Sequence, residues 1–219
     1  MPTHTPIPDT EPSSPAAPGR RDKRKIESRQ RLLAAARQLF VERGYHDTRP
    51  QDITRLSGVG HGTFYLYFTD KRACFEAFAA QAQQEIDLLI QVRLEKCDTA
   101  AERVYGVMET SMDYARSNPG VLKAALTGQQ LISREHPEAD GSASIIDVWA
   151  SRWAEIIRRE QASGRIWADY DPAIVGYAVM MVITVVTGDS QVAGSDKQHF
   201  LTNLTRFVLR ALAAPEKII

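Results

Sequence analysis

The chain has 219 residues, of which 43% are hydrophobic and 25% are charged. This composition is typical of globular proteins and excludes a wholly disordered or fibrous chain. The net charge is zero, but residues 1–69 hold 11 Lys and Arg against 7 Asp and Glu, whereas residues 70–219 hold 16 against 20. A basic front and an acidic back are expected where one end of a protein faces phosphates.

The N-terminal segment is rich in proline and poor in apolar residues. Residues 1–19 contain six of the 11 prolines, so we expect this stretch to be disordered. A basic cluster, Arg20–Lys25, follows it, so the expected disordered and basic tail spans residues 1–25. The tail is either a solubilising segment or an arm that follows a DNA backbone or enters the minor groove. It also lacks the apolar run of a signal peptide, so we expect a cytoplasmic protein.

The next stretch predicts a first helix from about Glu27 to Arg43. Gly44 follows as the C-terminal stop. Apolar residues fall on one face of this helix: Leu32, Leu33, Ala36, Leu39 and Phe40.

The stretch from Asp52 to Lys71 has the pattern of two short helices joined by a glycine turn. Gly58, Val59 and Gly60 interrupt two segments of helical spacing, which predicts a helix-turn-helix that places its second helix in the DNA major groove. The small core of the motif is expected to comprise Ile53, Leu56, Val59, Phe64 and Phe68. The residues expected to face outward on the second helix are His61, Gly62, Thr63, Tyr65, Leu66 and Tyr67. None of them is acidic, so nothing repels phosphate.

The wider window resembles the N-terminal domain of TetR-family transcriptional regulators. The resemblance runs without gaps from Leu32 to Lys71, and its most specific part is the segment GTFYLYF with the lysine that follows. It implies an N-terminal three-helix DNA-binding domain over residues 26–71. The chain departs from the family pattern at Arg49-Pro50 and at Gly60. Because arginine is a poor helix cap, Thr48 is a candidate cap instead.

The resemblance also implies which residues contact DNA. Thr63, Tyr65, Tyr67 and Lys71 occupy positions whose family counterparts hold the DNA backbone. His61 and Gly62 lie at the leading end of the second helix, near the bases. The expected DNA-binding residues are Thr48, Arg49, Gln51, His61, Gly62, Thr63, Tyr65, Tyr67 and Lys71.

Residues 72–219 are expected to form a larger helical domain, which makes the protein all-α. A helix from Asp70 to Glu95 leads into it, and Thr99 with Glu102 predicts a capping box for the next helix. That helix ends at Asn118-Pro119-Gly120. Further segments are predicted in chain order: a short helix from Val121 to about Leu131, a polar loop over residues 133–143, a helix from Ser144 that stops at Gly164, a helix capped by Asp171 and Pro172, and a last helix capped by Ser195 with Gln198.

The last two predicted helices carry more apolar surface than one chain needs. Residues 173–188 contain no charge and are too few to span a bilayer, so we expect a buried helix. The last helix has a wide apolar stripe that includes Leu204 and Val208. A helix that is apolar all round must be covered all round, which predicts a two-fold homodimer through these helices. The resemblance implies the same interface.

Aromatic and methionine residues on successive helices predict a cavity for a small apolar or aromatic ligand. They are also common in an ordinary core. The expected lining comprises Tyr105, Met108, Met112, Trp149, Trp153, Tyr177, Met180 and Met181, with Glu109 and Gln129 as polar anchors.

Evidence for an enzyme is weak. The glycines of residues 58–62 follow no strand, and neither a GxSxG nor an HExxH motif occurs. His136, Glu138 and Asp140 are better interpreted as a solvated loop than as a metal site. Cys74 and Cys97 lack a partner that would activate them. We therefore expect neither a cofactor nor a metal.

The sequence as a whole predicts a homodimeric DNA-binding regulator, a repressor that leaves its operator DNA when it binds a small apolar or aromatic ligand. Its partners would be double-stranded operator DNA, a second copy of the chain and the ligand, with no membrane. The alternative is an all-α enzyme or carrier of an apolar ligand that does not bind DNA.

Overall fold

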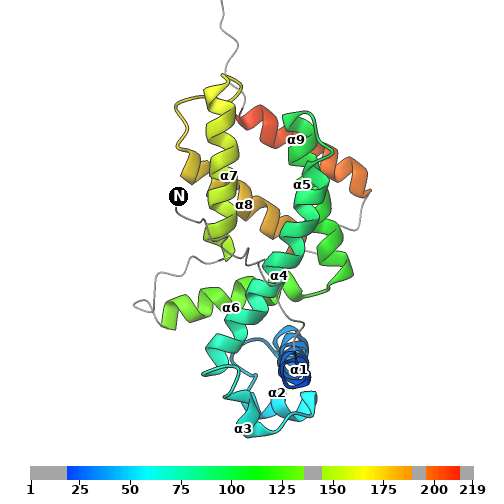
Figure 1. Ribbon diagram of the computed structural model, residues 1–219. Helices are drawn as coiled ribbons and strands as arrows, with labels where there is room; N and C mark the ends of the chain where they lie inside the picture. Colours follow the sequence, from blue (N-terminus) through cyan, green and yellow to red (C-terminus); the bar gives the residue numbers. More distant parts are fainter. Residues whose placement is uncertain (1–18, 136–144, 189–195, 213–219) are drawn as a thin grey trace, which may run out of the picture.

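The computed structural model describes residues 19–135, 145–188 and 196–212, and within these ranges the regular elements are all helices (Figure 1). This confirms the all-α prediction. In chain order the helices are α1 (Arg20–Arg43), α2 (Pro50–Ser57), α3 (His61–Phe64), α4 (Lys71–Leu94), α5 (Ala100–Ser117), α6 (Val121–Glu135), α7 (Ile145–Ala162), α8 (Pro172–Gly188) and α9 (Lys197–Leu212).

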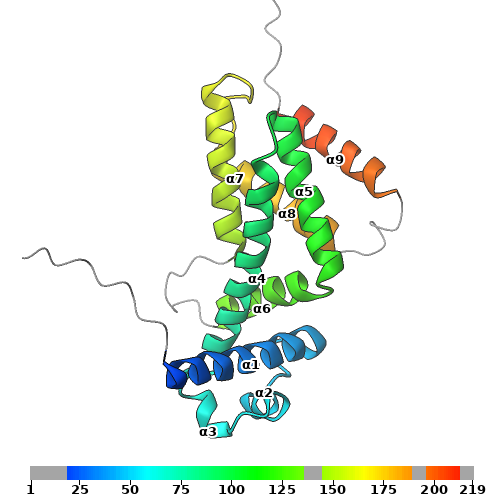
Figure 2. The same ribbon diagram turned by 45° about the vertical axis from the view of Figure 1, so that its right-hand side comes forward.

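Helices α1, α2 and α3 form one end of the molecule, and α4 runs from them to the other helices (Figures 1 and 2). Helix α1 begins at Arg20, seven residues before the predicted start. The basic cluster Arg20–Lys25 is therefore helical, so the prediction of a disordered tail up to residue 25 is wrong for these residues. The proline-rich residues 1–18 lie outside the described ranges.

The core of this end contains most of the predicted residues, but not Leu56. Ile53, Phe64 and Phe68 are buried, whereas Leu56 is 46% exposed. Helix α2 instead turns Ile53, Thr54 and Ser57 inward. Its two small polar residues fit there because each hydroxyl donates to a carbonyl three residues earlier, at 3.0 Å and 3.1 Å.

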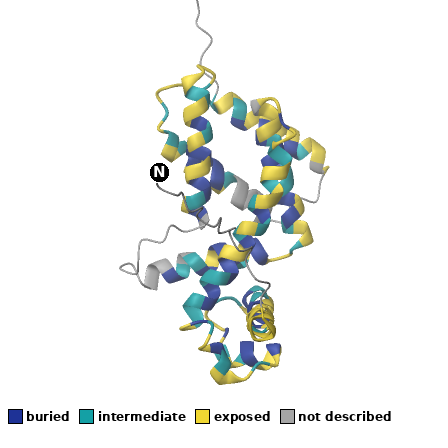
Figure 3. Cartoon of the chain, viewed as in Figure 1, coloured by how far each residue is buried: buried dark blue, intermediate teal, exposed yellow. Residues whose placement is uncertain are grey.

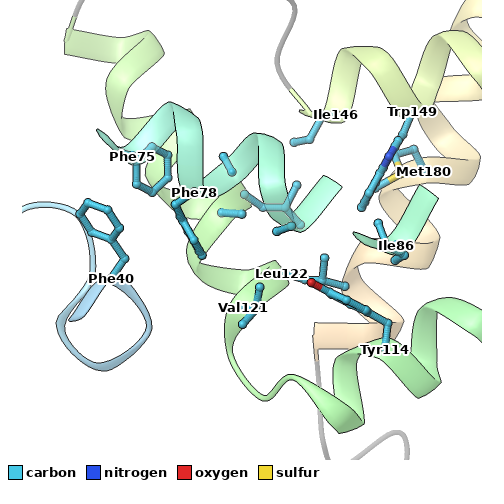
Figure 4. Packing of buried hydrophobic residues seen from close by; sticks show 14 of the residues in the cluster. Phe40, Phe75, Phe78, Ile86, Tyr114, Val121, Leu122, Ile146, Trp149 and Met180 are labelled. Carbon is cyan, nitrogen blue, oxygen red and sulfur yellow. The ribbon is translucent and has the colours of Figure 1, made fainter. Parts of the chain in front are cut away.

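Helix α4 is shared between the two ends, as predicted. Asp70 caps it by accepting a hydrogen bond from the Ala73 amide at 2.8 Å, and Glu95 follows its last residue. Near its start, the ring of Phe75 meets the ring of Phe40 at 5.1 Å between centroids (Figure 4). It also meets the ring of Tyr45 at 5.2 Å. Helix α6 also lies across α4, at Gly128, where an added Cβ would lie 2.3 Å from the Phe75 ring. These contacts fix α4 against both α1 and α6.

The predicted helix starts in the second domain are largely confirmed. Thr99 and Glu102 form the reciprocal capping box of α5. The Asp171 carboxylate accepts the amides of Ala173 and Ile174 at 2.7 Å and 3.3 Å, so it caps α8. Gly164 follows α7 with φ +72°, which favours glycine at that stop.

Two boundaries differ from the prediction. Helix α6 continues to Glu135, so residues 133–135 are helical and not part of a loop. The rest of that predicted loop, residues 136–143, lies outside the described ranges. The start of α9 is capped by Asp196, whose carboxylate accepts the amides of Gln198 and His199 at 3.1 Å and 3.3 Å. Ser195, the predicted cap, falls in a range that the structure does not describe.

The outer surfaces of α8 and α9 remain exposed in the single chain (Figure 3). On α8, the apolar residues Ile174, Tyr177 and Met181 are 70%, 44% and 39% exposed. Phe207 on α9 is 65% exposed. The single chain therefore covers only part of α8, and the covering of its other face by a second copy stays a prediction. None of the described helices is long and apolar enough to cross a membrane.

Candidate DNA interface and ligand cavity

A glycine turn sets the angle between α2 and α3. Gly58 adopts φ 64° and ψ 26°, the left-handed conformation that ends a helix most readily when the residue is glycine. The Val59 amide then bonds back to the Thr54 carbonyl at 3.2 Å. Gly60 precedes α3 without a side-chain cap, and Arg31 of α1 donates to the Ser57 carbonyl at 2.5 Å. The two helices and α1 are therefore held together at the turn.

One side of α3 and the turn after it faces outward. His61, Gly62, Tyr65 and Leu66 are exposed, and Leu66 is 80% exposed. The rings of His61 and Tyr65 meet edge to face at 5.4 Å between centroids. Phe64 lies on the opposite side, completely buried. This arrangement places an imidazole and a phenol together on the exposed side of the motif.

Helix α2 packs against α3. Arg49 and Gln51 are exposed at the start of α2, as expected of DNA-contacting residues. Thr48 is different, because it is completely buried and its hydroxyl donates to the carbonyls of Gly44 at 2.8 Å and Leu39 at 3.3 Å. Its side chain neither faces solvent nor caps α2. The expectation that Thr48 contacts DNA through its side chain is therefore corrected.

Lys71 is engaged within the chain. Its ammonium donates to the carbonyls of Tyr45 and His46 at 2.9 Å and 3.3 Å and lies 4.2 Å from the centroid of the Tyr45 ring. These contacts join the start of α4 to the turn after α1. Thr63 on α3 and Tyr67 just after it are half-buried.

An apolar cavity of about 260 Å³ lies in the second domain, between α4, α5, α6, α7 and α8. Figure 4 shows Ile86, Leu122, Trp149 and Met180 gathered on that side of the core. The lining residues are Ile86, Asp87, Ile90, Gln91, Leu94, Val107, Ser111, Leu122, Leu126, Trp149, Arg152, Trp153, Ile156 and Met180.

The sequence prediction of the lining was partly right. Trp149, Trp153 and Met180 line the cavity. Met108 and Met112 are buried in the core away from the cavity, and Tyr105 packs against the edge of that core. Tyr177 and Met181 are exposed on α8. Glu109 pairs with Arg93 at 3.4 Å and does not line the cavity, and Gln129 does not line it either.

A polar group that the sequence analysis missed lies in the cavity wall. The carboxylate of Asp87 accepts the Trp149 indole N–H at 3.2 Å and also a hydrogen bond from Arg152. Asp87 is on α4 and the other two are on α7, so the ion pair bridges the two helices. The partners are 62 and 65 residues apart in sequence. No local pattern reveals such a pair.

A second cavity, of about 430 Å³, lies between α5, α7 and α9. It shares Val107, Trp153 and Ile156 with the first, so these three side chains separate the two. Its outer residues include Arg103, Glu160 and Arg165, and Arg165 lowers the pKa of Glu160 by hydrogen bonding to it.

A hydrogen-bonded network connects α1 to the second domain. Arg37 of α1 donates to both oxygens of Glu85 on α4 at 2.9 Å, and to the Asn118 side chain at 2.7 Å. The Tyr114 hydroxyl of α5 donates to Glu85 at 2.7 Å. We call Arg37, Glu85, Tyr114 and Asn118 the interdomain network.

The network perturbs the pKa of its members. Burial acts to raise the pKa of Glu85, but the hydrogen bonds from Tyr114 and Arg37 outweigh it and lower that pKa. Burial, together with the bond to Glu85, raises the pKa of Tyr114 to about 12. Near neutral pH the carboxylate is therefore charged and the phenol neutral, which are the forms that the network needs.

The described residues hold no cluster of three or more His, Cys, Asp or Glu that could bind a metal. His136, Glu138 and Asp140 lie outside those residues. Both cysteines are buried, and burial raises the pKa of the Cys74 thiol to about 12, which disfavours the reactive thiolate.

Comparison with known proteins places this geometry among bacterial regulators. The family "Bacterial regulatory proteins, tetR family" matches residues 32–78. The nucleoid occlusion factor SlmA of Actinobacillus pleuropneumoniae serotype 5b (strain L20) is 28% identical over 142 residues, which cover 64% of this chain and 69% of that protein.

Solved structures share the fold over nearly the whole chain. A TetR-family transcriptional regulator from Haemophilus influenzae superposes with a TM-score of 0.66 at 16% identity, covering 88% of this chain and 100% of the other. One from Pectobacterium atrosepticum superposes with a TM-score of 0.59 at 22% identity, covering 88% and 97%.

The helix-turn-helix on a helical second domain defines a DNA-binding transcriptional regulator. Residues 32–78 of the chain match the TetR family of bacterial regulatory proteins, and the whole fold is similar to that of TetR-family regulators.

Proposed function

We propose that this protein is a homodimeric repressor that leaves its operator when a small apolar ligand fills the cavity of the second domain. The observation that carries the proposal is the position of α4. Its start, at Lys71, belongs to the DNA-binding end, and its residues Ile86 and Ile90 form part of the cavity wall. A ligand that moves this wall moves an element of the DNA-binding end as well.

The proposed reading surface is the exposed face of α3 with the start of α2. His61 and Gly62 would approach base edges, because they lead the helix and are exposed. Arg49, Gln51, Thr63, Tyr65 and Tyr67 would hold the DNA backbone. Lys71 would also contact the backbone, but only through ammonium hydrogens that do not donate to the carbonyls of Tyr45 and His46.

The proposed dimer interface is the exposed apolar surface of α8 and α9. Ile174, Tyr177 and Met181 repeat at spacings of three and four on α8, so they share one face. Phe207 extends the apolar surface on α9. Val208, which the sequence analysis placed in the interface, is 5% exposed and belongs to the chain's own core. A two-fold pairing would cover this surface.

The proposed switch uses the interdomain network beside the cavity. Glu85 precedes the wall residue Ile86, and Tyr114 lies one turn beyond the wall residue Ser111. A change in the spacing of α4 and α5 therefore acts on Glu85, which accepts from Arg37, and on Tyr114, which donates to Glu85. The ligand must favour the DNA-incompetent arrangement, because equal affinity for both arrangements shifts nothing.

The experiment begins with selection of bound fragments from a random DNA pool, and the selected operator defines the probe. Binding that falls steeply with salt is expected of a DNA regulator and not of a carrier. Compounds from a ligand screen are then titrated into the free dimer and into the operator complex. By linkage, DNA must weaken ligand binding by the factor with which ligand weakens DNA binding. Equal dissociation constants in the two titrations would rule out the switch.

A further inference from the structure

The first two turns of α1 carry a positive surface that the reading face of α3 does not include. Five of the first six residues of the helix are cations, all exposed, and Asp22 is the single acid among them. Arg20, Arg24 and Ser28 are spaced four apart, and Arg21 and Lys25 lie beside them. These four cations and Ser28 therefore share one side of the helix.

This side of α1 adjoins the reading face. Figure 2 shows the dark blue start of α1 over α3. One open depression is lined by Tyr67, just beyond α3, and by five residues of α1: Arg20, Arg21, Arg24, Lys25 and Ser28. The depression thus presents four cations and two hydroxyls, with no carboxylate among the residues that line it. Such a set of donors suits the oxygens of a phosphate.

The folded chain by itself gains little from this arrangement. Like charges four apart repel along a helix, and positive charge in the first turn opposes the helix dipole. Gly19 adds no side-chain cap. Within the described part of the chain, none of the four arginines and lysines in the depression forms an ion pair. An external anion would relieve the repulsion that the sequence leaves in place.

We infer that Arg20, Arg21, Arg24 and Lys25, with the hydroxyls of Ser28 and Tyr67, bind backbone phosphates of duplex DNA next to the bases that α3 reads. The inference rests on the proposed function, since it needs α3 to be seated in the major groove. The surface offers donors without apolar wedges, so it adds affinity and sets position but reads no sequence. The contacts come from a rigid helix, and an ordering cost on binding is correspondingly small.

The test is the full-length variant R20A/R21A/R24A/K25A, assayed on the selected operator. Alanine keeps the helix and removes the repulsion, so thermal stability should be equal to or higher than that of the wild type. Operator affinity should fall at least tenfold near physiological salt, and the salt slope should flatten by about 0.9 for each phosphate that the variant no longer neutralises. Base preference in the selection should not change.

A matched variant, K96A/K123A/R158A/R159A, removes the same charge from exposed positions of the second domain. It separates local binding of phosphates from the general field of the protein, because it changes the net charge equally and, within the described residues, otherwise removes only the exposed ion pairs of Arg158 and Arg159 with Glu155. If both variants bind the operator with the same affinity and salt slope, the inference is overturned.

Shortening the operator duplex locates the phosphates that α1 binds. The wild type should lose affinity as flanking base pairs are removed, whereas the α1 variant should not respond. Equal responses of the two proteins would contradict the inference. The inference would also be contradicted if the α1 variant lost binding to anionic phospholipid vesicles while its DNA affinity stayed unchanged. If the wild type binds no duplex at all, the proposed function itself fails.

Discussion

Thr48 illustrates how a polar residue near a DNA-binding motif can serve the fold alone. Its hydroxyl bonds to two carbonyls at the end of α1, Leu39 and Gly44, and the side chain is inaccessible. It therefore fixes the turn that leads into α2. Thr63 is a half-buried threonine on α3, the helix proposed to face DNA. The two residues allow stability and DNA binding to be separated.

Thr48→Val is expected to lower the free energy of unfolding by about 1–3 kcal/mol, because it leaves buried acceptors with fewer donors. The base preference of the folded protein should be unchanged. Urea unfolding and operator selection measure the two properties. Thr63→Val serves as the control, with weaker operator binding and nearly normal stability. A stable Thr48→Val protein with altered base preference would restore Thr48 to the DNA interface.

His61→Ala is expected to alter base preference at one position of each half-site, by about 1–3 kcal/mol if the imidazole makes a good base contact. The side chain is exposed and meets the Tyr65 ring edge to face, so stability should hardly change. Competition binding with single-base operator variants measures the effect. Lys71→Ala is a poorer probe, because it also removes the bonds to Tyr45 and His46. An unchanged preference in His61→Ala would refute base reading by this residue.

At the scale of single elements, α8 and α9 expose apolar surface that the second copy of the proposed dimer would cover. Phe207→Asp is expected to break the dimer, since a carboxylate buried in an apolar interface has no partner. Operator affinity should then collapse, because two half-sites are no longer bound together. Sedimentation and operator binding report the two effects.

Leu88→Asp provides the matched control for Phe207→Asp. Leu88 is 63% exposed on α4, close to the 65% of Phe207, and it lies outside the proposed interface. The control should remain dimeric. An intact dimer in Phe207→Asp, or a broken one in Leu88→Asp, would move the interface to another surface.

The interdomain network makes the free energy of unfolding depend on pH in the alkaline range. The pKa of Tyr114 is raised from 10 to about 12, so its contribution is complete below pH 10 and is lost as pH rises through about 12. Tyr114→Phe removes the hydroxyl that donates to Glu85 and should cost about 1 kcal/mol at neutral pH. Unfolding at several pH values measures the difference between the two proteins. That difference should shrink between pH 10 and 12, and a constant difference would contradict the assignment.

At the scale of the whole molecule, the packing of α4 against α1 and α6 predicts that both ends unfold together. Phe75 links α4 to Phe40 and Tyr45 of the DNA-binding end and to α6 at Gly128. All three tryptophans follow residue 144, so their fluorescence reports the second domain, whereas circular dichroism reports every helix. The two signals should change at the same denaturant concentration. An earlier dichroism transition would show that the DNA-binding end unfolds independently.

The sequence predicted well those features that local chemistry determines. The capping box of Thr99 and Glu102, the cap at Asp171 and the stop at Gly164 each depend on a few adjacent residues. The start of α1 was missed because Gly19 offers no side-chain cap and the cations that follow are unfavourable there. Leu56 was misplaced because its spacing from Ile53 suits a buried face, whereas α2 is rotated to bury Thr54 and Ser57.

The ligand cavity was harder to predict, because helical periodicity does not specify which neighbour an apolar face meets. Met108 and Trp153 look equivalent in sequence, yet only Trp153 reaches the cavity. The pairing of Asp87 with Arg152 and the bond from Arg37 to Glu85 join distant segments. Such contacts depend on how α4 and α7 approach each other and on where α1 docks, which no single stretch encodes.

The length of α4 has a mechanical consequence. Its 24 residues form a lever about 36 Å long at 1.5 Å of rise per residue. Pivoting such a rod through only about 5° displaces its tip by about 3 Å, which is the length of a hydrogen bond. A small displacement of α4 by a ligand in the cavity would therefore become a larger displacement of α3 relative to the DNA major groove. Shortening the lever arm, by a kink introduced between the cavity and Lys71, would uncouple the two ends without touching either.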